Sequence, residues 1–217
     1  MNGLAQHTEL LEKIASEFAA AERRIKATEL RFPGMGLVTP AINQLRYCGK
    51  HILDAFGATT EKDQIENLDE AVSHCRRASY DALEAGIVGY LETFKQFRDD
   101  YQDILLSRAI PQWQTHLGRI EEIRKLVIGV DRSNREVAFE QFKTFLDEFV
   151  EIANQLTLAT EELKRLRMEE AQVMKRLKEE SLDAKASVER AAKVRRLFVT
   201  VAGGVCLAAA FFYVFLS

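Results

Sequence analysis

Apolar residues recur every three or four positions along most of this chain, which is the period of an amphipathic α-helix. In the first part of the chain this stripe includes Leu11, Ile14 and Phe18. The stretch Arg31-Phe-Pro-Gly-Met-Gly36 then interrupts the pattern, because Pro and Gly end helices. The pattern predicts a first helix over residues 4–31.

Two further helices are predicted before residue 107. Thr39-Pro40 is typical of a helix start, with Thr39 as the N-cap, and Gly57 is typical of a helix end. A third helix is expected to begin near residues 59–63 and to reach as far as Leu106, since no proline interrupts it. One row of this helix carries only small residues: Cys75, Ser79, Ala82, Gly86 and Gly89. A row of small side chains lets a neighbour approach closely, so this helix is predicted to be central.

Pro111 and Gly129 bracket a fourth helix, and Asp131–Asn134 supplies N-cap candidates for a fifth. There is no Gly or Pro from Val130 to Ala202. An apolar seam with an average spacing near that of a coiled coil runs along the first part of the fifth helix. We predict that these residues mediate assembly: Phe142, Phe145, Phe149, Ile152, Leu156, Leu163 and Leu166. Beyond Leu166 the seam becomes dilute, which is typical of a solvated helix or of a loosely paired one.

Residues 197–217 contain no charged side chain. A helix needs about 20 predominantly apolar residues to cross a bilayer, so this stretch predicts a transmembrane anchor; a buried core helix is the alternative. The basic residues Lys193, Arg195 and Arg196 precede it, and the positive-inside rule then favours a cytoplasmic body and a single-pass, tail-anchored topology. Within the anchor, small residues that permit close helix contact are Gly203, Gly204 and Ala208.

Together these patterns predict an all-α protein built as an antiparallel four- to five-helix bundle. Residues 1–130 would form the bundle and residues 131–196 a long helix that packs on it at first and then becomes a juxtamembrane stalk. Residues 197–217 would form the anchor. The lipid bilayer is thus one expected partner, and a second copy or another helical protein is the other.

Composition narrows the function. The net charge of −3 hides an asymmetry, because residues 161–196 contain 11 basic and 8 acidic residues and residues 1–160 are therefore acidic. An acidic body disfavours nonspecific binding to nucleic acid, which depends on phosphate neutralisation. Cys48 and Cys75, without a CxxC or Cys/His motif, predict neither a disulfide framework nor a zinc site and fit a reducing compartment. The first residues have no signal-peptide pattern. No nucleotide-binding or hydrolase motif is present, and no cofactor is expected.

One spacing points to chemistry. Arg46 and His51 stand five residues apart within Arg46-Tyr-Cys-Gly-Lys-His51, and this resembles the Arg-x(4–6)-His signature of HEPN domains, which are all-helical dimers of prokaryotic defence and toxin systems. The resemblance implies that Arg46 would bind phosphate and that His51 would act in acid–base chemistry during RNA cleavage. On an ideal helix the two residues do not share a face. The interpretation that both are ordinary polar positions therefore stays open.

The order of a helical bundle, a heptad helix and an anchor also resembles that of syntaxin-type SNARE proteins. The eighth layer counted from Phe142 is Leu166, where that family has Gln or Arg, so the resemblance concerns topology. The expected function is a non-enzymatic interaction, scaffold or signalling module at a membrane. A membrane-tethered HEPN-like ribonuclease and an oligomeric membrane-perturbing effector are the alternatives.

Overall fold

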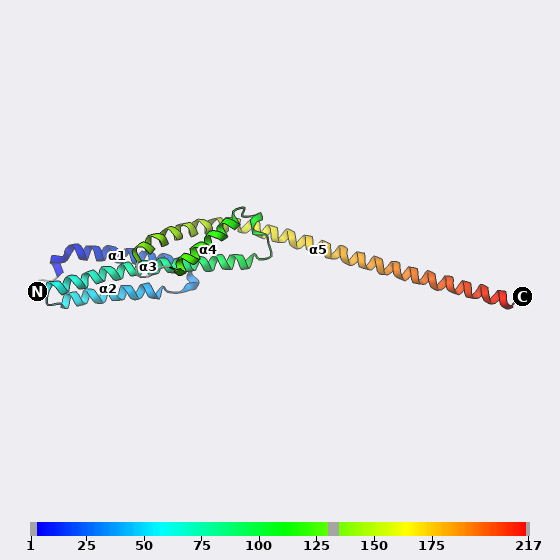
Figure 1. Ribbon diagram of the computed structural model, residues 1–217, viewed down its shortest axis with the longest axis horizontal. Helices are drawn as coiled ribbons and strands as arrows, with labels where there is room; N and C mark the ends of the chain where they lie inside the picture. The colour runs from blue at the N-terminus through cyan, green and yellow to red at the C-terminus, as the bar shows by residue number, and fades with distance from the viewer. Residues whose placement is uncertain (1–3, 130–134, 216–217) are drawn as a thin grey trace. The chain divides into compact units, whose positions relative to one another are not determined.

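The structure is a computed structural model that describes the backbone of residues 4–129 and 135–215 and the side chains of residues 6–129, 138–196 and 200. Within these ranges the chain is helical, without strands (Figure 1). The α-helices are α1 (Thr8–Arg31), α2 (Thr39–Gly57), α3 (Glu61–Asp100), α4 (Trp113–Gly129) and α5 (Arg135–Phe215). Short 3₁₀ helices are η1 (Leu4–His7), η2 (Pro33–Met35) and η3 (Leu106–Arg108). The all-α prediction is confirmed.

The chain divides into two compact units, residues 1–163 and residues 164–217, and α5 contributes to both. In the first unit, α1 and α2 lie along α3 (Figure 1). Two apolar clusters hold these three helices together. One is centred on Cys48, Leu68 and Cys75, and the other on Ala41, Ala78 and Ala82. Since most of these side chains are small, the three helices can pack closely.

The small residues predicted to form one row of α3 are buried. At Gly89 the absence of a side chain lets an aromatic ring approach the helix. A Cβ atom at Gly89 would lie 2.6 Å from the Phe32 ring, whereas a Cβ atom at Gly86 would lie 3.2 Å from a methyl group of Leu146. The Phe32 ring also contacts Tyr90 edge-on, with 4.9 Å between ring centroids. Gly89 is therefore the position where α3 accepts the aromatic residue that follows α1.

Aromatic residues join α3 to α4 and α5. Tyr80 stacks on Phe142 with 5.1 Å between centroids, and Phe94 meets Phe149 edge-on at 5.0 Å. Trp113, at the start of α4, is buried. Aromatic pairs of this kind contribute about 0.5–1.5 kcal/mol each beyond the apolar area they bury. Tyr80 and Phe94 of α3 are thus covered by the first part of α5.

Two helix starts show where local signals succeed and fail. The third helix begins within residues 59–63 as expected, and Thr60 caps it, because its hydroxyl accepts a hydrogen bond of 3.1 Å from the Asp63 N–H. The prediction that Thr39 caps α2 is wrong: Thr39 is the first helical residue and Val38 precedes it as the cap. The Val38 N–H instead donates to the Glu29 carboxylate of α1 at 3.0 Å. The N–H of the cap residue is thus satisfied by a tertiary contact, and no side chain of the described residues caps the first turn of α2.

The α5 seam is buried in the protein's own fold. Phe142, Phe149 and Leu163 have no exposed side-chain surface. The other four members of the seam are at most 7% exposed: Phe145, Ile152, Leu156 and Leu166. These seven side chains are thus buried, whereas the predicted division into bundle, long helix and anchor and the role of the seven residues in assembly stay predictions.

No helix among the residues that the structure describes is long and apolar enough to cross a membrane. The predicted anchor falls largely outside that set, because the side chains of residues 197–199 and 201–217 are not described. The same holds for Gly203, Gly204 and Ala208. The N-cap candidates at 131–134 also lie outside the described residues.

Candidate functional site

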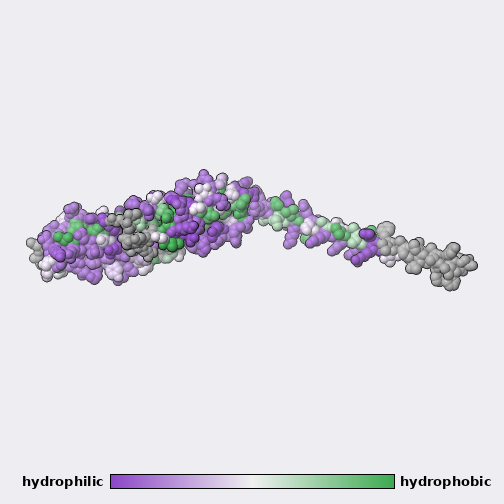
Figure 2. Space-filling model, in the orientation of Figure 1, coloured by the Kyte–Doolittle hydropathy of each residue, from purple (hydrophilic) through white to green (hydrophobic). Residues whose placement is uncertain are grey.

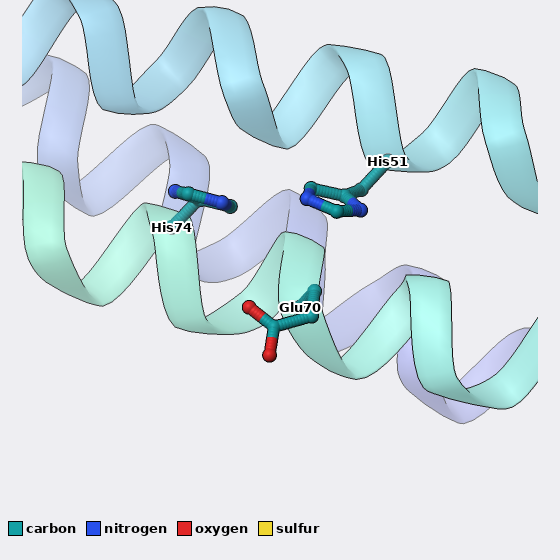
Figure 3. Close-up of side chains that lie close together, drawn as sticks. All are labelled: His51, Glu70 and His74. Carbon is teal, nitrogen blue, oxygen red and sulfur yellow. The ribbon is translucent and has the colours of Figure 1, made fainter.

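Three potential ligand residues meet on the α2–α3 pair. His51 comes from α2, whereas Glu70 and His74 come from α3, four residues apart and therefore on one helix face. One ligand atom from each residue lies within 4.8 Å of the others. Both histidines are half-buried and Glu70 is exposed. Figure 3 shows the two imidazole rings side by side, with the Glu70 carboxylate near both.

The hydrogen bonds of the two imidazoles indicate their protonation. Nδ1 of His51 lies 3.1 Å from the side-chain oxygen of Asn67, and Nδ1 of His74 lies 2.7 Å from that of Gln44. The Asn67 amide is oriented independently, because its nitrogen donates to the Asp63 carbonyl at 2.9 Å. An amide oxygen only accepts, so Nδ1 of His51 carries the proton, and Nδ1 of His74 does so with the Gln44 amide oriented as the structure has it. Each Nε2 is left with a lone pair.

The surroundings of His74 favour its neutral form. Its ring lies nearly parallel to that of His51, with 5.1 Å between centroids, and 5.4 Å from the Tyr47 ring. The pKa of His74 is lowered, first because the ring is partly removed from water and then because Arg77 and His51 are nearby; Glu70 opposes this shift. The neutral imidazole is the form that binds metal ions.

Two thiols lie in the core, and their residues are close to the two histidines in the sequence. Cys48 and Cys75 have no exposed surface, and their sulfur atoms are 3.3 Å apart. The pKa of the Cys75 thiol is raised, because it donates to Cys48 and because it is buried. Both cysteines belong to the apolar cluster between the helices. They are free thiols that serve packing, as their sequence context predicts.

The structure gives Arg46 and His51 different surroundings. Arg46 is exposed and its guanidinium donates to Asn43 on its own helix at 2.9 Å. His51 instead faces Asn67 and His74 of α3. The catalytic pairing implied by the HEPN resemblance stays a prediction.

Glu70 and His74 are site residues that the sequence reasoning missed. Their spacing of four residues indicates that they share one face of a helix, but nothing in the sequence showed that His51 would lie opposite them. The basic residues that precede the apolar segment, Lys193, Arg195 and Arg196, are exposed, as their charge requires.

Comparison with protein-family models, with curated proteins and with solved structures finds no match.

Proposed function

We propose that this protein is a membrane-anchored, non-enzymatic helical module that works by binding a second copy of itself. The observation that carries the proposal is the course of α5, which spans Arg135–Phe215 as one helix. Its first part contributes buried side chains to the core, and its last part, residues 197–215, lies within the charge-free segment 197–217. One element thus links a folded body to a segment of membrane-spanning length.

The residues before the apolar segment support an orientation. Lys193, Arg195 and Arg196 are all exposed, and no acidic residue lies between them and Ser217. Basic side chains at the end of a membrane helix favour the cytoplasmic side and the anionic lipid surface. The body would then face the cytoplasm.

The surface for self-association would lie on residues 168–194. Apolar side chains that are more than half exposed recur there: Met168, Val173, Met174, Leu177, Leu182, Val188 and Val194. Hydrophobic residues are visible on the surface of this segment in Figure 2. Val173, Leu177 and Val194 continue the spacing of the buried α5 seam. A matching helix would cover them by coiled-coil pairing.

Membrane extraction tests the anchor. The full chain is expected to stay in the membrane pellet after alkaline carbonate washing. The double substitution Val205→Arg/Ala208→Arg should release it, because each charge at the centre of a membrane helix costs about 2.5–3.5 kcal/mol.

The matched control is Val205→Leu/Ala208→Leu, which keeps the segment apolar and should remain in the pellet. The anchor proposal fails if the wild-type chain is released by carbonate. It also fails if the two arginines leave membrane retention unchanged.

A further inference from the structure

We propose that His51, Glu70 and His74 form a Zn²⁺ site that joins α2 to α3. The proposal is independent of the membrane anchor, because all three residues lie in the first compact unit. It assigns to these side chains a role that neither core packing nor the Arg46–His51 spacing explains.

The strongest argument is the direction of the ring nitrogens. Each Nδ1 is occupied by an amide oxygen, of Asn67 for His51 and of Gln44 for His74. In Figure 3 one nitrogen of each ring faces the other ring, and by elimination this nitrogen is Nε2. Histidines that bind metals usually donate their second ring N–H to a protein oxygen, which fixes the tautomer and the ring orientation. Asn67 and Gln44 occupy that supporting position here.

The distances are compatible with one small ion. Zn²⁺ binds nitrogen and oxygen ligands at about 2.0–2.2 Å, which places neighbouring ligand atoms of a tetrahedral site about 3.4 Å apart. The three ligand atoms here lie within 4.8 Å of one another. Glu70 is exposed and its side chain has three rotatable bonds, so rotation about these bonds can bring its carboxylate closer to both rings.

The ligand set selects the class of metal. Two imidazoles and one carboxylate suit Zn²⁺ and its transition-metal neighbours, whereas Mg²⁺ and Ca²⁺ prefer oxygen ligands alone. The thiols of Cys48 and Cys75 are fully buried and hydrogen-bonded to each other, so they are not counted as ligands. The ligand set is therefore two nitrogens and one oxygen. The exposed side at Glu70 leaves the fourth position to water, as in zinc sites with two histidines and one glutamate.

Arg77 is the local competitor for Glu70. Its guanidinium lies 3.8 Å from the Glu70 carboxylate. A bound Zn²⁺ would compete with Arg77 for this carboxylate, and its positive charge would be repelled by the guanidinium. The substitution Arg77→Gln is therefore expected to strengthen Zn²⁺ binding.

Metal titration of the full chain in detergent, without a polyhistidine tag and after chelator treatment, tests the site. Calorimetry with Zn²⁺ should show one ion per chain, and Co²⁺ should give the visible absorption of a four-coordinate complex. His51→Ala and His74→Ala should each weaken binding on the order of 100-fold. His116→Ala is the matched control, because His116 also bonds a side-chain amide, that of Gln155 at 2.8 Å, and it should bind as the wild type does.

A variant of Asn67, which supports His51 but is not a ligand, distinguishes metal binding from a purely structural role of the histidines. Asn67→Leu removes no ligand but should weaken Zn²⁺ binding about 10- to 100-fold, since it frees the Nδ1 proton of His51. Circular dichroism of each variant checks that the helices are retained. The proposal is overturned if the wild-type chain binds no Zn²⁺, a result that depends on no variant folding. It is equally overturned if binding survives in the His51→Ala/His74→Ala double variant.

Discussion

Gly89 is the residue where the packing of α3 tolerates no side chain. The nearest atoms to a Cβ at this position belong to the Phe32 ring, at 2.6–2.8 Å. A phenyl ring that also packs on Tyr90 cannot turn away as the end of a flexible chain can. At Gly86, by contrast, the nearest atom is a methyl group of Leu146, at 3.2 Å. The two glycines look alike in the sequence and differ in this environment.

Gly89→Ala should therefore destabilise the protein. Overpacking costs about 1–3 kcal/mol, and the gain in helix propensity of about 1 kcal/mol offsets part of it, so we expect a net loss of up to about 2 kcal/mol. Gly86→Ala is the matched control and should be close to neutral, because the Leu146 methyl can shift. Denaturant unfolding followed by the fluorescence of Trp113, the only tryptophan, measures both. Equal stability of the two variants would contradict this account.

At the scale of elements, an ion pair with two hydrogen bonds links α4 to α5. The Arg119 guanidinium donates two hydrogen bonds to the Glu148 carboxylate, at 2.6 and 2.8 Å, and it also pairs with Glu122 of its own helix at 2.7 Å. The pKa of Glu148 is lowered, first by the hydrogen bonds from Arg119, while partial burial opposes the shift. The two side chains are 34% and 33% exposed, so solvent screening keeps the contribution modest.

This ion pair should make stability depend on pH in the acidic range. Because the pKa of Glu148 is lower in the folded state than in the unfolded one, its contribution is present above the unfolded value of about 4.3. It disappears as the pH falls through the folded value. At pH 7, Glu148→Gln should cost about 0.5–1 kcal/mol, and this difference from the wild type should vanish in strongly acidic solution.

Glu122→Gln is the control for that prediction, since Glu122 pairs with Arg119 within α4 and its side chain is 60% exposed. It should cost less than Glu148→Gln at pH 7. Denaturant titrations at several pH values, again followed by Trp113, provide the comparison. A cost of Glu148→Gln that stays constant with pH would show that the carboxylate charge contributes nothing.

At the scale of the whole molecule, the proposed assembly depends on which apolar residues remain accessible. The seam residues from Phe142 to Leu166 are buried, so they would have to leave the core before they could bind a partner. Val173 and Leu177 are 52% and 53% exposed. Residues 168–194 can therefore form a self-association surface without any unfolding of the core, whereas the seam from Phe142 to Leu166 cannot.

The double substitution Val173→Glu/Leu177→Glu should abolish dimers of the full chain while leaving its helicity unchanged. Charged residues at these seam positions would repel each other across a paired coil. Leu158→Glu is the matched control, because Leu158 belongs to the same helix and is 83% exposed but lies off the seam. Crosslinking in membranes and analytical ultracentrifugation in detergent measure the outcome. Dimers that persist in the double variant would rule out this surface.

The sequence by itself determined the helical architecture and most helix boundaries. Apolar periodicity and the positions of Pro and Gly are local signals, and helices are made of local hydrogen bonds. The end of α1 at Arg31 and the cap at Thr60 follow from such signals. The charge-free segment 197–217 is also visible in the sequence alone, and the anchor that its length and composition predict stays a prediction.

Only the tertiary structure decided which distant residues meet. The register between α2 and α3 places His51 opposite Glu70 and His74, and no local pattern encodes that register. A long-range contact is also formed at the start of α2, where the Val38 N–H donates to the Glu29 carboxylate of α1. Likewise, Phe142 and Phe149 of the α5 seam pack on Tyr80 and Phe94 of α3. These features depend on long-range packing, whose free energy is gained only when separate helices come together.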